Sequence, residues 1–515
     1  MFETSFFING FNKLFHTLSV VFQNSLFGKA ILAICCGLKK AFDRSYLIGL
    51  LRKPGSNSYH EESLFYRGLD QVINFVPMLL KRLYKRFEST FSNSLFFKLI
   101  MIIAQNVSVV IALFMVAVFV IPHQTAHLKW DNMYSAIAAI FCFLLFLLNT
   151  MKEKDLRFQV KPFSVFFYAF ALMVVVGQIF SVEPSLSFRF FVFYMTCFIF
   201  VFLMVSSIRT RDQLSTFTEL ILVGVSISGL YGIYQGMKGV PVNAAQIDYT
   251  LNEGVPGRIF STFDNPNNFA QVLAMMLPFY IAVFLSAKGI KKKIIFALAA
   301  LPPLASLLLT FSRSSWIGFA VAVFVFLFLT NKKLIPVFVV LGLLALPFMP
   351  SSILTRISTI FMPQDTSTSY RFDIFKTVWP MVQDFNLFGI GLGHEVVSQI
   401  NQNYPIYSTK VPIHAHNLYL QIWAEMGLIA LTAFILFLGK IFKACFIKVA
   451  TFRTDKEMSY YLAAGAASLA GVLVTALAEY VWFYPRVMLV FWMVVGLVLA
   501  ALLMAKDSQA SEVTK

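Results

Sequence analysis

Charged residues are scarce in this chain of 515 residues. They make up 13% of it, whereas a soluble globular domain carries about a quarter. Because 58% of the residues are hydrophobic, a soluble core could not hide all the apolar surface, and lipid must cover part of it. The apolar stretches also lack the two-residue alternation of barrel strands, which excludes a closed β-barrel.

Cysteine is rare as well, with five residues in the whole chain. These are Cys35, Cys36, Cys142, Cys197 and Cys445. All fall within apolar spans or on the side assigned below to the cytoplasm, so we expect no disulfide in the outer loops. We expect no cleavable signal peptide either, because polar residues interrupt the first apolar stretch and no small-residue cleavage site follows it.

Long apolar stretches recur from about residue 99 to residue 505. Each is long enough to cross a hydrocarbon core of about 30 Å as a helix. The sequence therefore predicts an all-α, polytopic integral membrane protein with about twelve transmembrane helices. The predicted spans are residues 98–121, 131–149, 162–181, 188–207, 214–237, 267–286, 294–311, 314–330, 334–350, 415–438, 459–480 and 486–504.

The connecting segments predict the orientation. Lys and Arg gather in MKEKDLRFQVK, IRTRDQ, AKGIKKK, NKK and the stretch from Lys440 to Lys456. Short basic loops of this kind stay in the cytoplasm, so both termini are expected there, in the plasma or inner membrane. The net charge of +17 then reflects topology and the anionic inner leaflet, and membrane lipids, not nucleic acid, are the expected partners.

The chain divides into five predicted regions. Residues 1–97 contain no adequate span; they hold Ser-initiated apolar blocks such as NSLFGK and NSLFFK, each expected to open an amphipathic helix at the cytoplasmic membrane surface. This region is interpreted as a surface anchor, with a docking platform for a cytoplasmic partner as the alternative. Residues 98–350 hold nine spans, 351–414 a large outer loop, 415–504 three spans and 505–515 a cytoplasmic tail.

The long outer loops carry the candidate functional residues. A structureless loop as long as 351–414 is improbable, so short helices lying over the outer face are expected. Arg258 lies between Gly257 and an aromatic residue near a helix start, a setting that suits an anionic ligand. Arg313, in TFSRSSW, either binds the same ligand or snorkels to lipid headgroups. Asp264 and Asn265 are interpreted as turn and cap residues.

Two further motifs lie in and after the second long loop. GIGLG follows no strand and is interpreted as a tight loop, not a nucleotide site. His414 and His416 flank Ala415 above the tenth span, and three alternatives stay open for them: a zinc site completed by His394 and Glu395, interfacial histidines without a role, and acid-base chemistry. Acid-base chemistry is favoured.

Four motifs, in this order, resemble a known family. They are GRIFSTFDNPNNFA, TFSRSSW, YRFDIFKTVW leading into LFGIGLG, and HAHNLYLQIWAEMGLI. Together they resemble the O-antigen ligase and polysaccharide polymerase superfamily over about residues 160–500, leaving out the N-terminal 97. The resemblance implies a GT-C-like membrane fold and a metal-independent, inverting glycosyltransferase without a cofactor. It also implies a polyprenyl-diphosphate-linked glycan as donor and a sugar hydroxyl on a glycan or glycolipid as acceptor.

The resemblance also assigns residues. His416 matches the essential loop histidine, and Arg258 and Arg371 match the arginines that hold the diphosphate. Two guanidiniums can bind the diphosphate and stabilise its developing charge, and one base then suffices to activate the acceptor. Arg313 is a third candidate diphosphate ligand. Possible auxiliary residues are His414, Asn417, Asn267 and Glu425.

Several alternatives stay open at this point. His414 could be the base in place of His416, and ligase and repeat-unit polymerase are not distinguished. Other polysaccharide-assembly proteins are conceivable partners. The rival from another class is a transporter or flippase for the same lipid-linked glycan. It is disfavoured because transporters place ionisable residues near the midplane on broken helices, whereas charge here gathers at the outer surface.

Overall fold

A computed structural model supplies the structure of the chain. It describes isolated positions between residues 20 and 37, and then residues 63–513 except 123–130, 154, 242–255, 362–365, 409–410 and 452–454. Contacts divide the chain into two compact units: residues 1–56 with 327–349, and residues 57–326 with 350–515. The described part of the first unit includes the apolar helix α17 (Ile335–Ala345).

Helices long and apolar enough to cross a membrane dominate the described residues, which confirms the predicted all-α polytopic class. Nine qualify by length and composition. They are α10 (Asp131–Lys152), α12 (Pro184–Ser207), α13 (Arg211–Lys238), α14 (Pro266–Ser286), α15 (Ile290–Leu309), α16 (Arg313–Thr330), α21 (Leu418–Thr451), α22 (Lys456–Thr475) and α23 (Pro485–Val513). The pair α8 (Leu95–Gln105) and α9 (Val107–Val120), bent by 65°, makes a tenth if it is one span.

The predicted count of twelve is not confirmed. The two remaining predicted spans correspond to α11 (Val165–Ile179), with 15 residues, and α17, with 11. At 1.5 Å per residue such helices reach only about 22 and 16 Å, less than a hydrocarbon core of about 30 Å. Both segments were predicted as spans because their apolar residues continue past the helix ends into turns, and hydropathy does not show where a helix ends.

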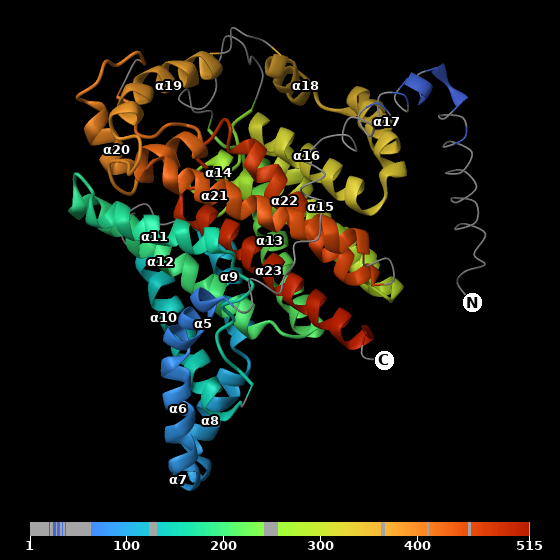
Figure 1. The fold of residues 1–515 in the computed structure, drawn as a ribbon. Coiled ribbons are helices and arrows are strands. Elements are labelled where there is room, and N and C mark those ends of the chain that lie inside the picture. Colours follow the sequence, from blue (N-terminus) through green and yellow to red (C-terminus); the bar gives the residue numbers. More distant parts are fainter. Residues whose placement is uncertain are drawn as a thin grey trace. The chain divides into compact units, whose positions relative to one another are not determined.

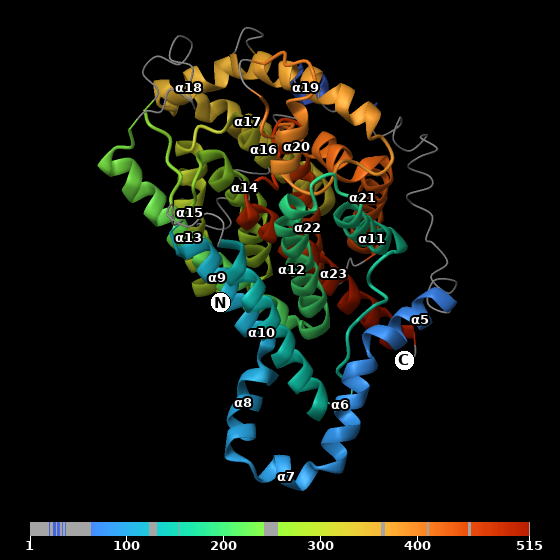
Figure 2. The same ribbon diagram turned by 90° about the vertical axis from the view of Figure 1, so that its left-hand side faces the viewer.

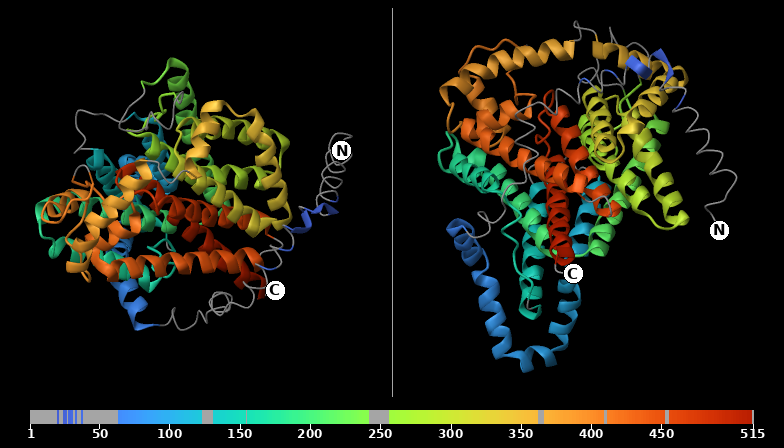
Figure 3. Two further views of the ribbon diagram at one scale, coloured as in Figure 1. Left: turned by 90° about the horizontal axis from the view of Figure 1, so that it is seen from above. Right: turned by 45° about the vertical axis from the view of Figure 1, so that its right-hand side comes forward.

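Small residues bring the central helices of the larger unit together. α22 packs between α14 and α21, and α23 packs on α12, so that α22 and α23 lie at the centre of this unit (Figure 3). A Cβ added to Gly318 of α16 would lie 2.1 Å from Thr475 Oγ1 and 2.6 Å from the carbonyl of Gly471 in α22. Only glycine allows backbones to approach this closely, as is usual between helices in lipid.

The segment 351–414 folds into short helices, as predicted. They are α18 (Ser351–Ser358), the 3₁₀ turn η4 (Thr359–Phe361), α19 (Thr366–Asp384) and α20 (His394–Asn401). α19 and α20 lie at one end of the helices of this unit, and α6 (Phe75–Arg86), α7 (Glu88–Asn93) and α8 form a hairpin at the opposite end (Figures 1 and 2). The sequence had assigned these two segments to opposite sides of the membrane.

Serine N-caps begin two of the described N-terminal helices, as predicted, whereas α6 and α7 have no side-chain cap. Ser63 accepts a hydrogen bond from the backbone N–H of Tyr66 at the start of α5 (Leu64–Ile73), and Ser94 accepts one from Phe97 at the start of α8. The side chain of Asn74, between α5 and α6, bonds both the N–H and the carbonyl of Phe158, at 2.8 and 3.1 Å. The N-terminal helices are therefore fixed to the connection between α10 and α11.

Helix α21 is broken at Gly427, where φ is +79°. The GIGLG motif closes the break. The N–H groups of Ile390 and Gly391 donate to the carbonyls of Ala424 and Glu425, at 2.9 and 3.0 Å. Gly389, Gly391 and Gly393 all have positive φ, which glycine adopts without strain. The interpretation of GIGLG as a tight loop is confirmed, and its role is to satisfy the backbone of the broken helix.

Candidate active site

Five loops that are distant in sequence meet at the end of the larger unit that carries α19 and α20. They precede α14, join α15 to α16, hold α18 and the start of α19, precede α21, and join α22 to α23. In the described residues, three non-glycine residues have a positive φ, namely Ser261, Phe311 and His416. All three lie in these loops. Backbone strain of this kind persists only where the surroundings enforce it, and it clusters at functional sites.

Glu479 is at the centre of this site. This residue is 7% exposed. Oε1 accepts hydrogen bonds from Arg371 Nη2 at 2.6 Å and from Asn267 Nδ2 at 3.4 Å, and Oε2 lies 3.7 Å from His416 Nδ1. Burial by itself raises the pKa of Glu479, but Arg371 and His416 outweigh burial and lower that pKa to about 2. The carboxylate is therefore anionic at neutral pH.

Arg258 joins the same network through Asn267. The residue is 6% exposed. Its Nε donates to the carbonyl of Thr310 at 2.7 Å, and its Nη2 donates to Asn267 Oδ1. Burial and the positive charge of Arg356 lower the pKa of Arg258 to about 9, with Glu479 acting in the opposite direction. Arg258 thus stays charged at neutral pH, and one asparagine connects it to the carboxylate that holds Arg371.

Two further arginines flank this pair. Arg313 Nη1 donates to the carbonyl of Thr359 at 2.9 Å, and Arg356 Nε donates to the carbonyl of Phe311 at 3.1 Å. Both guanidiniums act electrostatically on Arg258. The site therefore gathers four cationic side chains, from the loop before α14, the first residue of α16, and the helices α18 and α19.

The two histidines of the HAH motif differ in their surroundings. His414 Nδ1 accepts the backbone N–H of His416 at 3.2 Å, and its ring packs on that of Phe483 with centroids 4.6 Å apart. Burial and the charge of His416 hold the pKa of His414 well below its ordinary value, so His414 is neutral. The side chain of His416 is 28% exposed and faces Glu479. His416 is thus the histidine of the pair that faces the buried carboxylate.

The zinc alternative is not supported. Glu395 pairs with Arg189 at 3.3 Å, and the ring of Phe483 lies against both His394 and His414, with centroids 4.6 Å from each. Among the residues that the structure describes, no three His, Cys, Asp or Glu side chains gather as metal ligands. Burial and the charge of Arg189 lower the pKa of His394 to about 4.

Three other predicted residues have structural contacts. Asn265 caps α14 by accepting the N–H of Asn267 at 2.8 Å, and Asn268 donates to Asp264 at 2.9 Å, which confirms the turn and cap interpretation. Asn417 donates to the carbonyl of Leu477 at 3.0 Å and accepts the N–H of Leu420 at 2.9 Å. Asn417 thus joins the start of α21 to the loop that carries Glu479.

Glu425 lies behind the site and supports its loops. It is fully buried in α21. Its Oε1 accepts Gln421 Nε2 at 2.7 Å and the hydroxyl of Tyr480 at 3.0 Å. Gln421 Oε1 in turn accepts the N–H of Ala415 at 2.8 Å. Glu425 therefore holds both the HAH turn and the neighbour of Glu479.

Sequence reasoning missed two residues of the site. Glu479 lies within the predicted span 459–480, but α22 ends at Thr475 and leaves Glu479 in the loop that follows. Arg356 lies in a loop segment without a recognised motif. The sequence did contain one indication of Glu479. It lies at the outer end of its predicted span, on the same side as the HAH motif, where an acidic side chain is expected to pair with a basic one.

Comparisons with known proteins relate part of the chain to one family. Residues 296–435 match the model of the O-antigen ligase family. The chain is also 23% identical over 295 residues to the teichuronic acid biosynthesis protein TuaE of Bacillus subtilis (strain 168), and this match covers 54% of the chain and 59% of the relative. The predicted resemblance to the superfamily is thereby confirmed. The domain match includes Arg313, Arg356, Arg371 and His416, and excludes Arg258 and Glu479.

Proposed function

We propose that this chain is a membrane glycosyltransferase that moves a glycan from a polyprenyl diphosphate to a sugar hydroxyl in cell-surface polysaccharide biosynthesis. The observation that carries the proposal is the meeting of Arg258 and Arg371 with His416 around Glu479 and Asn267. Guanidiniums suit phosphate oxygens because their planar donors bind them in pairs. An imidazole beside them suits the removal of a proton from a hydroxyl.

The proposed reaction is a single displacement with inversion. The unprotonated ring nitrogen of His416 takes the proton of the acceptor hydroxyl, whose oxygen forms a bond to the anomeric carbon of the donor sugar. The bond from that carbon to the diphosphate oxygen breaks, and the electron pair leaves with polyprenyl diphosphate. Arg258 and Arg371 stabilise the added charge on the leaving group. Arg313 and Arg356 extend this positive surface.

Glu479 has two parts in this proposal. Its carboxylate faces Nδ1 of His416, so a proton on Nδ1 is favoured and Nε2 is left as the base. The distance of 3.7 Å is longer than a hydrogen bond, and such contacts often shorten only when substrate binds. The same carboxylate holds Arg371 at 2.6 Å and so fixes the guanidinium in place for the diphosphate.

One feature of the structure supports the transporter alternative. Helix α21 is broken two residues after the buried Glu425. Transporters use such breaks to line an ion or substrate path. Here the N–H groups of Ile390 and Gly391 occupy the carbonyls at the break, and Leu428 N donates to the carbonyl of Asn386 at 2.8 Å. Since protein backbone fills the break, we favour the enzyme.

Banding of surface glycan in a deletion strain tests the proposal. The strain is complemented with the wild type, Arg258→Ala, Arg371→Ala, Arg356→Ala or His416→Ala. We expect each variant to reach the membrane and to lose glycan transfer. Loss of a polymerase leaves single repeat units transferred, whereas loss of a ligase leaves long chains on the lipid carrier. Full banding with His416→Ala would instead support the transporter.

A further inference from the structure

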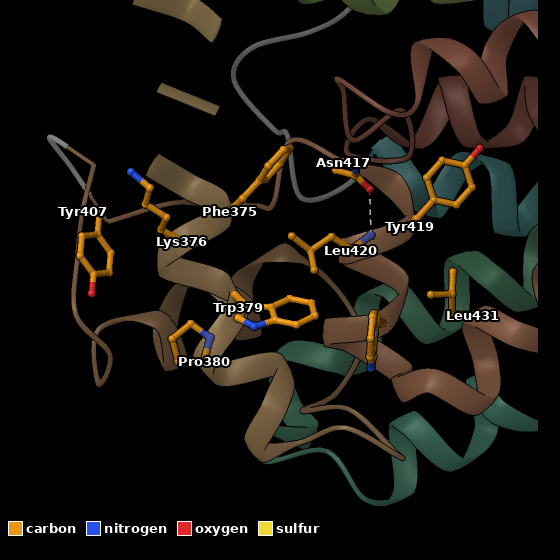
Figure 4. Close-up of a pocket in the computed structure, with 10 residues that line it drawn as sticks. Phe375, Lys376, Trp379, Pro380, Tyr407, Asn417, Tyr419, Leu420 and Leu431 are labelled. Carbon is orange, nitrogen blue, oxygen red and sulfur yellow. Dashed lines mark hydrogen bonds between the residues drawn. The ribbon is translucent and has the colours of Figure 1, made fainter. Parts of the chain in front are cut away.

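An apolar groove lies between α19 and α21, beside the candidate active site. Its volume is about 900 Å³. Phe375 and Trp379 point from α19 toward α21, and Leu420 lies opposite them (Figure 4). The full lining is Phe375, Lys376, Trp379, Pro380, Tyr407, Asn417, Tyr419, Leu420, Trp423 and Leu431. Aromatic rings dominate this wall, and Trp379 and Trp423 meet edge to face at 5.6 Å.

Most polar atoms of the lining are occupied by protein partners. The hydroxyl of Tyr419 donates to the carbonyl of Leu473 at 2.9 Å, and Trp423 Nε1 donates to the carbonyl of Asn386 at 3.1 Å. The amide of Asn417 bonds the backbone through both its oxygen and its nitrogen. A sugar ring needs hydrogen-bond partners for its hydroxyls, whereas a hydrocarbon chain needs none. The groove is thus suited to a hydrocarbon ligand.

The lining of the groove adjoins the proposed diphosphate site along the chain. On α19, Arg371 precedes Phe375 by one helical turn and Trp379 by two, a rise of about 12 Å that roughly two to three isoprene units cover. At the same end, Asn417 directly follows His416. Leu431 lies within the apolar helix Leu418–Ala450, a candidate membrane span. A chain attached to a phosphate at Arg371 can therefore follow the groove into the membrane.

We propose that this groove binds the first isoprene units of the lipid carrier, next to the diphosphate that Arg258 and Arg371 hold. The inference rests on the proposed function, because it assigns the tail of the same donor. Lipid around the protein is already apolar, so selectivity must come from shape and packing rather than from removal of water. Flat, branched isoprene units pack against rigid aromatic faces better than straight acyl chains do.

Photolabelling tests binding without any transfer step. The full chain in nanodiscs is exposed to a prenyl diphosphate of three isoprene units that carries a diazirine and no sugar. We expect labelled peptides from α19 and from residues 418–431, and competition by unlabelled prenyl diphosphate. Labelling outside these segments, or equal competition by a diacyl phospholipid, would overturn the assignment. Competition by a free oligosaccharide alone would show that the groove binds sugar instead.

Kinetics with two donors tests the role of the groove in transfer. The donors carry the same glycan on one or on three isoprene units. Trp379→Ala should raise the KM of the longer donor about tenfold, which corresponds to about 1.4 kcal/mol, and the KM of the shorter donor less than twofold. Trp379→Phe should restore most of the difference. The control is Phe141→Ala, a change of an aromatic residue that is 50% exposed on α10 and outside the groove.

The outcomes separate the two proposals. Equal changes of KM for both donors, or none, would refute the groove while leaving the transferase in place. If the wild type transfers glycan from neither donor although the label maps to the groove, the proposed reaction fails and the binding site remains.

Discussion

Replacing Arg371 by lysine separates the charge of this residue from its shape. Arg371 Nη2 lies 2.6 Å from Glu479 Oε1, and the two side chains are 22% and 9% exposed. Lysine keeps the positive charge and can still pair with Glu479, but its ammonium is a compact point charge and not a planar fork. We therefore expect Arg371→Lys to fold almost as stably as the wild type and to lose most of its glycan transfer.

The size of the effect follows from the lost contact with the diphosphate. One charge-assisted hydrogen bond contributes about 1.5 to 3 kcal/mol. If that contact is made in the transition state, its loss lowers the transfer rate roughly 10- to 150-fold. Arg371→Ala should lose stability as well, because it leaves the buried carboxylate of Glu479 without its arginine. For a fully buried pair this costs about 3 to 5 kcal/mol, and less here because Arg371 is partly exposed.

The assay compares initial rates of transfer and thermal unfolding of the purified variants in nanodiscs. A matched control is Arg157→Lys. Arg157 pairs with Asp70 at 3.3 Å, its side chain is 53% exposed, and α5, which carries Asp70, lies away from the site. This control should change neither quantity. If Arg371→Lys keeps more than half of the wild-type rate, bidentate binding of the diphosphate by the Arg371 guanidinium is refuted.

Three further predictions concern the same network. In the folded protein the pKa of Glu479 is about 2, against a usual 4.5. This difference contributes about 3 kcal/mol of stability above pH 4.5, which is lost as the pH falls toward 2. Glu479→Gln should therefore make the melting temperature less dependent on pH in that window, and an unchanged slope would contradict the ionic role. His416→Ala should abolish transfer at neutral pH and show part of the wild-type rate at high pH, whereas His414→Phe should keep measurable transfer. The dependence of the transfer rate on pH is measured for both variants, and the reverse pattern would make His414 the base. Gly391→Ala should lower the melting temperature by several degrees, because φ is +122° and the added Cβ would lie 2.0 Å from a serine oxygen. The control Gly439→Ala should leave the melting temperature unchanged, since no atom lies within 4 Å of its added Cβ. Equal melting temperatures of the two variants would refute the role of the tight loop.

The helical membrane architecture was predictable because lipid imposes a length and a polarity on each span. The helices at residues 131–149, 188–207 and 214–237 begin and end within a few residues of their predicted limits. The count was less predictable. Hydropathy does not distinguish a full span from a short apolar helix followed by a turn, as α11 and α17 show.

The site was only partly predictable from sequence. The resemblance of the motifs to a known family pointed to Arg258, Arg371 and His416, and their residue types suit an anion and a base. Glu479 could not be placed, since its role depends on three partners from α14, α19 and the HAH turn. The break in α21 was also missed, because Gly427 is a small residue within an apolar run and only the GIGLG loop beside it makes the bend stable.

The most direct test of the account is a transfer reaction with the purified chain. Nanodiscs containing the protein are given a polyprenyl-diphosphate-linked glycan and an acceptor oligosaccharide, and both the extended acceptor and the released polyprenyl diphosphate are measured. The account predicts one polyprenyl diphosphate released for each glycan transferred, and neither product with Arg258→Ala or His416→Ala. Equal product formation by the wild type and His416→Ala would contradict it.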